Sequence, residues 1–306
     1  MEYLWILAAI IAAALQTVRS AYQKKMIPQL GEYGATYIRF FYALPFTLLI
    51  FVFWFYFLKN EIPNLSANSL MFCLVGAFCQ VAFTLSLMIV FSFRNFAAGI
   101  AFSKTEVLIA AIVEIFVLNI YFLPVVNFGI FLGVFAVVFL SVAKQTTNIA
   151  DVLKKIYRSL FSFGTFLGLL TGMILAGSTL GYRLAIISIE SPILDATIYL
   201  SAIAIVTQTI VVGLWLYFYK KEQLYAVIKY WRPSLPAGIS GSGATAGWFI
   251  AFALASVAEV RAVGQVELIF SILVSMLFFK EKINKTEFFG IILLAASILI
   301  VIFAKI

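Results

Sequence analysis

The fold is decided by an apolar stretch at residues 260–279, which reads VRAVGQVELIFSILVSMLFF and carries one carboxylate, Glu267. About 20 residues of α-helix rise ~30 Å, which is the thickness of the hydrocarbon core of a bilayer. An ionised side chain at that depth costs about 3 kcal/mol or more, so a glutamate there needs a structural or functional reason. The stretch therefore predicts a membrane-spanning helix that places an acidic group inside the protein.

The same arrangement occurs a second time, 161 residues earlier. Under that shift Glu106 falls on Glu267, and the tripeptide Phe-Gly-Ile at 128–130 falls on the one at 289–291. Five apolar stretches of spanning length precede the segment 144–161 and five follow it, so the second repeat must cross the membrane upside down relative to the first. We therefore predict an all-α integral membrane fold of ten transmembrane helices, arranged as two inverted five-helix repeats at 1–143 and 162–306. The predicted spans are 3–22, 34–57, 67–91, 97–120, 124–143, 162–187, 193–219, 235–255, 260–279 and 287–304.

The composition supports a bilayer as the solvent. Of the 306 residues, 64% are hydrophobic and 11% are charged, against roughly 45–50% and about 25% in soluble domains. The net charge of +8 does not indicate nucleic acid, because the basic residues lie in small groups between apolar stretches, as topology determinants do. Lipid is the expected surrounding, and no nucleic-acid partner is expected.

The residue types argue against catalysis. The chain has no histidine, which removes imidazole bases, serine–histidine triads and the His-Glu-x-x-His zinc motif together. Its two cysteines, Cys73 and Cys79, are too few for a thiolate metal site. A phosphate-binding Gly-x-x-x-x-Gly-Lys-Ser/Thr loop is also missing, so transport by this chain must use a gradient rather than its own ATP hydrolysis. We expect no enzyme activity, no metal and no cofactor.

The distribution of Lys and Arg predicts the orientation. Connections after the odd-numbered predicted helices carry 14 of the 21 basic residues, whereas the opposite side carries Lys59 and Lys305 alone. The positive-inside rule then places the odd connections in the cytoplasm and both termini outside. The longest connection, 144–161, mixes charged and apolar residues, which indicates a short amphipathic helix on the membrane surface. We expect a multi-pass protein of a bacterial inner (cytoplasmic) membrane.

Several motifs resemble one transporter family. The stretch AVGQVELIF at 262–270 and the sequence FKEKIN at 279–284 are similar to the last two helices of EamA-like members of the drug/metabolite transporter superfamily, and YIRF at 37–40 and KTE at 104–106 resemble its first half. The resemblance implies a transporter fold whose members carry amino acids, quaternary amines, nucleotide sugars and other metabolites. Such proteins usually keep both termini in the cytoplasm, which is opposite to the orientation that the charges predict.

Two glutamates are candidates for substrate binding and proton coupling. Glu106 and Glu267 lie about ten and eight residues into their predicted spans, close to the middle of the bilayer. Small or hydroxylated residues share their helix faces, which favours contact with other helices or a cavity over contact with lipid. Each carboxylate either binds a cationic group or proton, or closes a hydrogen-bond network between helices, for example against an arginine. The residues leave both interpretations open.

Basic groups near these glutamates are candidates for binding an anionic part of a substrate. Arg39 lies about 9 Å into its span and contacts a substrate carboxylate or pairs with Glu106; the ion pair is favoured because it neutralises two buried charges at once. Lys104 is two residues from Glu106, so the two side chains lie on different faces of one helix. Three interpretations of Lys104 stay open: it binds the substrate, it pairs with Glu114, or it extends to the membrane interface. Under the 161-residue shift Lys104 corresponds to Gln265, which carries no charge.

Further polar or amphipathic side chains are candidates for the wall of a cavity, although helix packing explains each of them as well. They are Gln16 and Arg19 in the first predicted span, Gln80 in the third, Tyr199 in the seventh and Trp248 in the eighth.

Together these features predict a secondary-active transporter that moves a small polar metabolite, foremost an amino acid or related zwitterion, by alternating access. In this hypothesis Lys104 or Arg39 meets the carboxylate of the substrate and Glu106 meets its amine. One alternative is efflux or uptake of organic cations, quaternary amines or drugs, and another is a lipid flippase or scramblase that shares the fold. The protein is expected to act on a small-molecule substrate as a monomer or homodimer.

Overall fold

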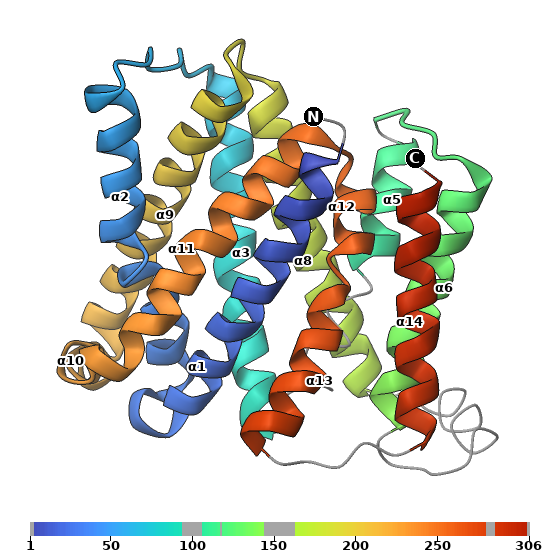
Figure 1. Cartoon of the computed structure of the whole chain (residues 1–306). Helices are drawn as coiled ribbons and strands as arrows, with labels where there is room; N and C mark the ends of the chain where they lie inside the picture. Colours follow the sequence, from blue (N-terminus) through green and yellow to red (C-terminus); the bar gives the residue numbers. More distant parts are fainter. Residues whose placement is uncertain (1–2, 94–105, 117, 144–162, 280–284, 305–306) are drawn as a thin grey trace. The chain divides into compact units, whose positions relative to one another are not determined.

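The computed structural model describes residues 3–93, 106–116, 118–143, 163–279 and 285–304 (Figure 1). Within these ranges every regular element is a helix, in agreement with the predicted all-α class. The elements are α1 (Leu4–Phe41), α2 (Leu44–Val52), the π-helical segment η1 (Phe53–Phe57), α3 (Ala67–Phe93), α5 (Glu106–Phe116), α6 (Pro124–Ala143), α8 (Phe163–Ile187), α9 (Ile193–Tyr219), α10 (Lys221–Lys229), α11 (Trp231–Leu254), α12 (Val257–Val263), α13 (Val266–Phe279) and α14 (Lys285–Phe303).

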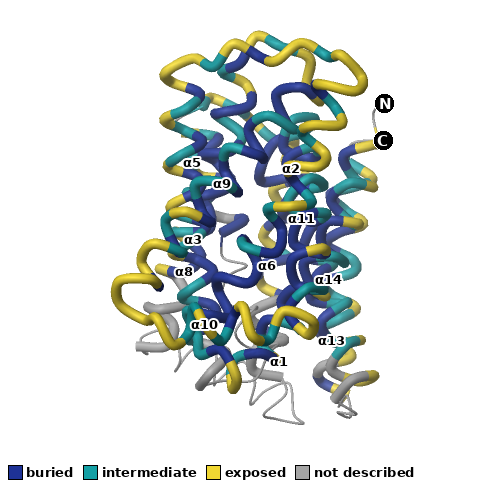
Figure 2. The backbone as a smooth tube through the Cα atoms, turned by 90° about the vertical axis from the view of Figure 1, so that its left-hand side faces the viewer, coloured by how far each residue is buried: buried dark blue, intermediate teal, exposed yellow. Residues whose placement is uncertain are grey.

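Helices of membrane-spanning length dominate the described residues. Large apolar side chains such as Leu49 and Phe218 are exposed on them, whereas polar side chains such as Gln208 are buried, which is the reverse of the pattern in water. Figure 2 shows buried and exposed positions alternating along single helices. The protein is therefore a multi-pass membrane protein. Five segments within the described ranges are long and apolar enough to cross a membrane, namely Leu4–Phe57, Ala67–Ile89, Leu170–Ile187, Ile193–Tyr219 and Trp231–Leu254.

The chain divides into two compact units, and each unit combines an early and a late part of the sequence. Unit 1 consists of Met1–Phe93 and Gly177–Leu254, and unit 2 consists of Arg94–Ala176 and Ala255–Ile306. Within unit 1, α1 packs along α11 and also contacts α3, α9 and α10; within unit 2, α6 packs along α14, and α5 packs against α12. Packing units and sequence repeats are different divisions, so the repeats stay a prediction. The surface helix expected at 144–161 lies outside the described residues.

Several predicted spans agree closely with observed helices, but the first one is too short. The spans 124–143 and 193–219 coincide with α6 and α9. α1 continues beyond residue 22 to a kink at Gly31, where φ is 69° and ψ is 173°. Glycine adopts this positive φ without strain. The predicted end followed the change to polar residues, but the helix continues, and the Nε2 of the buried Gln23 side chain donates to the Ala35 carbonyl across the kink at 2.8 Å.

A short helix that the apolar pattern did not predict, α10, connects α9 to α11 and lies crosswise to them (Figure 1). Its Gln223 side chain accepts a hydrogen bond from the Gly34 backbone N–H at 2.9 Å, just beyond the α1 kink. The Tyr42 hydroxyl donates to the Val227 carbonyl at 2.7 Å. The kink in α1 and the helix α10 therefore fix each other at one end of unit 1.

Candidate functional site

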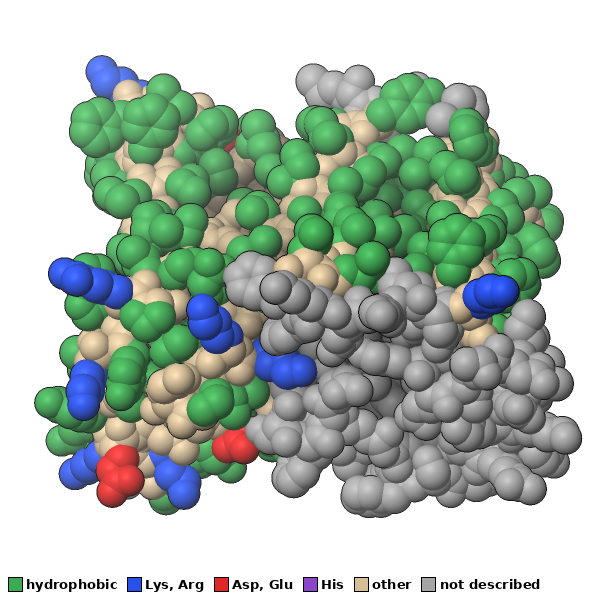
Figure 3. All heavy atoms as spheres, turned by 60° about the horizontal axis from the view of Figure 1, so that its bottom comes forward, with side chains coloured by type: hydrophobic (Ala, Val, Ile, Leu, Met, Phe, Trp, Pro, Cys, Tyr) green, Lys and Arg blue, Asp and Glu red, His purple; other side chains and the backbone are tan. Residues whose placement is uncertain are grey.

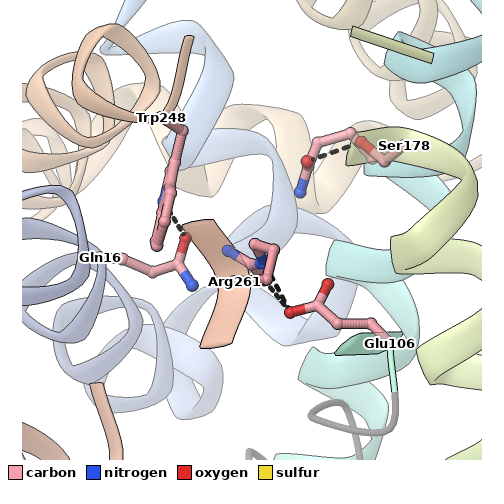
Figure 4. A network of polar contacts seen from close by, with 6 residues as sticks. Gln16, Glu106, Ser178, Trp248 and Arg261 are labelled. Carbon is pink, nitrogen blue, oxygen red and sulfur yellow. Dashed lines mark hydrogen bonds and ion pairs between the residues drawn. The ribbon is translucent and has the colours of Figure 1, made fainter. Parts of the chain in front are cut away.

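A buried ion pair lies in unit 2, between Glu106 in the first turn of α5 and Arg261 in the last turn of α12. The Arg261 Nε donates to Glu106 Oε1 at 2.6 Å, and its Nη2 forms an ion pair with the same oxygen. The side chains are 3% and 1% exposed, and Figure 4 shows the guanidinium pointing at the carboxylate. Glu106 thus pairs with an arginine, one of the two interpretations that the sequence left open, but the arginine is Arg261, which the sequence did not single out. Its predicted pairing with Arg39, which belongs to unit 1, stays a prediction.

A second carboxylate, that of Glu114, holds the other end of α12. Its two oxygens accept the backbone N–H groups of Val257 at 2.7 Å and Ala258 at 2.9 Å. The Ser256 hydroxyl caps the same end by accepting from the Glu259 N–H at 3.3 Å. A negative group at a helix N-terminus satisfies unpaired donors and complements the helix dipole. α5 therefore supplies one carboxylate to each end of α12, which is buried along its whole length.

The predicted ninth span, 260–279, is wrong as a single helix. A turn at Gly264 and Gln265 separates α12 from α13. Glu267 consequently lies in the first turn of α13, where it is 3% exposed, instead of eight residues into a continuous helix. Hydropathy shows no gap here because both short helices are apolar. Interrupted helices recur at the binding sites of transporters, since their ends present backbone groups to ligands.

Gln265, the predicted counterpart of Lys104, occupies this turn. It is 1% exposed and packs onto Gly133 of α6, where an added Cβ would lie 2.8 Å from its Oε1 and 2.9 Å from the Ser297 hydroxyl oxygen. Among the described residues the Gln265 Oε1 has no hydrogen-bond partner. An unsatisfied buried acceptor costs about 1–3 kcal/mol, so this atom is a candidate to bind a donor group. Lys104 itself lies outside the described residues.

In unit 1, Arg39 is the centre of a second polar network. It is 6% exposed, and its Nη1 donates to the Thr84 hydroxyl of α3 at 2.7 Å. The Gln80 amide is oriented with its oxygen toward Arg39 and accepts hydrogen bonds from the Arg39 Nη1 and Nη2 at 3.0 and 3.2 Å. Its amide nitrogen then donates to the Ser178 hydroxyl at 2.9 Å. This amide orientation satisfies every partner at once. Because Gln80 and Thr84 are one turn apart on α3, both face the same guanidinium.

Arg19 of α1 lies beside Arg39, and both stems approach Gly241 of α11. A Cβ at Gly241 would lie 3.4 Å from Arg19 Cδ and 3.7 Å from Arg39 Cγ. Arg19 is 1% exposed. One turn away on α1, the Gln16 side-chain oxygen accepts from the Trp248 Nε1–H at 2.9 Å, as Figure 4 shows. Four of the predicted polar residues are therefore buried in the interior of unit 1, and two of them carry permanently charged guanidinium groups; the four are Gln16, Arg19, Arg39 and Gln80.

Tyr199 lies in an aromatic cluster between α9 and the α2–η1 segment. Its ring stacks on Phe51 at a centroid distance of 6.1 Å and meets Phe55 edge-on at 6.3 Å. On the same elements, the Trp54 Nε1 donates to the Asp195 carboxylate at 2.7 Å. These contacts are ordinary aromatic packing near the start of α9, and a place for Tyr199 in a cavity wall stays a prediction.

The sequence analysis did not anticipate three of the observed partners: Thr84, Arg261 and Glu114, the last of which it named only as a possible partner of Lys104. A local signal existed for Thr84, since it follows Gln80 by four residues and must share its helix face. For Arg261 and Glu114 the partners lie more than 140 residues away in the chain, and periodicity carries no information on such pairs. Within the described ranges, no three acidic or thiol side chains are grouped as a metal site would require.

Comparison with known proteins agrees with a helical membrane protein. Residues 162–303 match the profile of the EamA-like transporter family. A solved structure described only as the crystal structure of a protein is similar over 96% of this chain and 94% of its own, with a TM-score of 0.66 and 11% sequence identity. At that identity the likeness concerns the fold alone. No curated protein matches the chain.

Proposed function

We propose, from the match of residues 162–303 to the profile of the EamA-like transporter family, that this chain is a member of that family, part of the drug/metabolite transporter superfamily, and that the whole protein is a transporter. The motifs at 262–270 and 279–284 predicted the same family. Members of this family are transporters rather than enzymes. The proposed activity is secondary-active, alternating-access movement of a small polar metabolite that carries a carboxylate, foremost an amino acid or related zwitterion.

The observation that carries the proposal is the Arg39 network in unit 1. A guanidinium inside a membrane protein is costly and marks a substrate or ion pathway more often than a packing contact. Its planar donors match a carboxylate in a bidentate geometry. Gln80 and Thr84 hold the Arg39 guanidinium in one orientation, and Arg19 adds a second positive charge across Gly241. This arrangement supports binding of an anionic group in the interior of unit 1.

Acidic groups for the cationic part of the substrate, or for a coupled proton, are proposed in unit 2. The Glu106 carboxylate is balanced by Arg261, so an ammonium group or proton that neutralised Glu106 would release the guanidinium and disturb the C-terminal end of α12. A buried charge that loses its partner is destabilised by several kcal/mol. Binding at Glu106 is thereby linked to a rearrangement of α12, and Glu267 at the start of α13 is the second candidate for the proton.

The overlap of two pairs of helices under the 161-residue shift supports the two-repeat plan on which alternating access depends. α6 shifted by 161 residues becomes 285–304, and α14 spans Lys285–Phe303. α5 shifted by the same amount becomes 267–277, which lies inside α13. We therefore propose ten transmembrane helices in two inverted repeats, at 1–143 and 162–306, with 144–161 as the connection.

Flux measurements on the purified protein in liposomes test the proposal. We expect saturable uptake of an amino acid, and the Arg39→Gln variant should reduce it at least about ten-fold, because a charge-assisted hydrogen bond contributes about 1.5–3 kcal/mol. Arg39→Lys should retain part of the flux, since it keeps the charge and loses the bidentate geometry. Lys59→Gln, which removes one exposed charge near η1, is the control and should transport normally.

Each alternative function gives its own result in the same liposomes. Normal uptake by Arg39→Gln would show that Arg39 is not the anion site. Flux of quaternary amines without flux of amino acids would support organic-cation transport instead. Movement of labelled lipid between leaflets, independent of any ion gradient, would support a scramblase.

A further inference from the structure

We propose that α10 and the adjoining ends of α9 and α11 form a binding site for the head group of an anionic phospholipid. α10 is nine residues long, lies crosswise to the two membrane-spanning helices that it connects, and has charged residues at both ends (Figure 1). A helix in this position lies at the level of the lipid head groups.

Positive charge is concentrated on this end of unit 1. The segment 220–232 contains Lys220, Lys221, Lys229 and Arg232 against a single acidic residue, Glu222, and all of these side chains are exposed. Figure 3, which brings the lower end of Figure 1 forward, shows Lys and Arg side chains gathered over the described part of this face. Clusters of basic residues beside a membrane attract anionic lipids, and each Lys or Arg contributes about a five-fold gain in affinity.

Aromatic rings hold these cations at the height of the interface. The Lys221 Nζ lies 5.0 Å from the centre of the Tyr217 ring, and the Arg232 guanidinium lies 5.3 Å from that of Trp231. Tyrosine and tryptophan rings concentrate where the hydrocarbon core meets the head groups. The cations are therefore positioned where lipid phosphates lie, instead of extending into bulk water.

The outward face of α10 offers apolar side chains as well as charged ones. Tyr225 is 70% exposed and Ile228 is 57% exposed, and they lie between the basic residues at the two ends of the helix. The helix cannot turn to bury them in unit 1, because Gln223 and the Val227 carbonyl fix its inner face to α1 and Tyr42. A soluble anion would leave these side chains in water, whereas a phospholipid offers an anionic head group and an acyl chain together.

Lipid retention by the purified full-length protein tests the site. The protein is placed in nanodiscs of phosphatidylcholine with phosphatidylglycerol, and the co-purifying lipid is counted by native mass spectrometry. We expect preferential retention of phosphatidylglycerol, and at least a ten-fold weaker preference in the variant Lys221→Gln/Lys229→Gln/Arg232→Gln. The matched control Lys221→Arg/Lys229→Arg/Arg232→Lys keeps the charges and should keep the preference.

Three outcomes would overturn the proposal. The first is equal retention of the two lipids by the wild-type protein, and the second is an unchanged preference in the neutral triple variant. The third is displacement of phosphatidylglycerol by millimolar-range inorganic phosphate, which would make the site a phosphate site rather than a lipid site. Because the substituted side chains are exposed, the thermal unfolding temperature should be the same in the triple variant and its control. Transport is not measured, so failure here leaves the proposed function untouched.

Discussion

The ion pair between Glu106 and Arg261 places two opposite charges in the buried interior of unit 2. Transfer of each charge from water costs several kcal/mol, and their mutual attraction offsets this cost only while both are present. The energetic role of either residue therefore depends on the other, and a single substitution measures mainly the destabilisation of the charge left behind.

A double-mutant cycle measures this dependence. Glu106→Gln keeps the shape of the side chain and should lower the free energy of unfolding by about 3–5 kcal/mol, because Arg261 loses its counter-charge. Adding Arg261→Gln should restore most of that loss. Thermal unfolding in detergent gives the comparison, and a double variant as unstable as the sum of the two single variants would show that the residues are not coupled.

The sequence predicted which charged residues are buried better than it predicted their partners. Arg39, Glu106 and Glu267 stand in apolar stretches of spanning length, so their burial follows from hydropathy, and the structure buries all three. Their partners depend on how distant helices pack. Arg39 is 45 residues from Thr84 and Glu106 is 155 residues from Arg261, and the apolar periodicity of one helix does not specify its neighbour.

At the scale of the elements, the errors arise where a helix is interrupted or kinked and the composition gives no sign of it. The turn at Gly264 and Gln265 is flanked by apolar residues on both sides, and the helix before the Gly31 kink contains polar ones. The hydropathy of a segment indicates whether lipid or water surrounds it, but it carries no information about the backbone dihedral angles. Boundaries at Pro124 and Pro192 were placed correctly because proline is suited to the first turn of a helix or the position before it.

Close approach of α11 to the end of α1 requires a glycine at one point. A Cβ at Gly238 would lie 2.3 Å from Tyr42 Cβ and 2.4 Å from the Tyr42 carbonyl carbon, whereas one at Gly241 would find its nearest atoms at 3.4 Å. The two glycines are almost one turn apart on the same helix, and both are buried. They therefore form a matched pair for a test of packing.

Gly238→Ala should lower the free energy of unfolding by about 1–3 kcal/mol, because the added methyl overlaps backbone atoms that cannot move aside. Gly241→Ala should leave stability unchanged or raise it by up to about 1 kcal/mol, since alanine favours the helix and its Cβ makes only ordinary contacts. Thermal unfolding of the two purified variants distinguishes them. Equal unfolding temperatures would contradict the close contact at Tyr42.

At the scale of the whole molecule, unit 1 has one end that is rich in basic residues and another that has few of them. Lys25 lies shortly before the α1 kink and Lys229 lies at the end of α10, and these two elements are hydrogen-bonded to each other. Lys59 follows η1, whose Trp54 is hydrogen-bonded to Asp195 at the opposite end of α9. The predicted orientation places the basic end in the cytoplasm and the Lys59 end outside.

Cysteine labelling in intact cells tests that orientation. In a background without Cys73 and Cys79, Lys59→Cys should react with a membrane-impermeant maleimide added outside. Lys25→Cys and Lys229→Cys should react only after the cells are permeabilised. The opposite pattern would place both termini in the cytoplasm, as the family resemblance implies, and would refute the charge-based orientation.

The division of each unit between two parts of the chain has a consequence for biosynthesis. A ribosome that adds about 5–20 residues per second needs roughly 4–17 s to proceed from Phe93, where the first part of unit 1 ends, to Gly177, where its second part begins. During that interval α1, α2 and α3 are in the membrane without α9 and α11. The Gly34 N–H then lacks its hydrogen-bond acceptor, the side chain of Gln223, which is 189 residues away in the chain. Newly made helices must therefore remain stable in lipid before they assemble, and neither fragment of a chain cut within 144–161 would contain a whole unit.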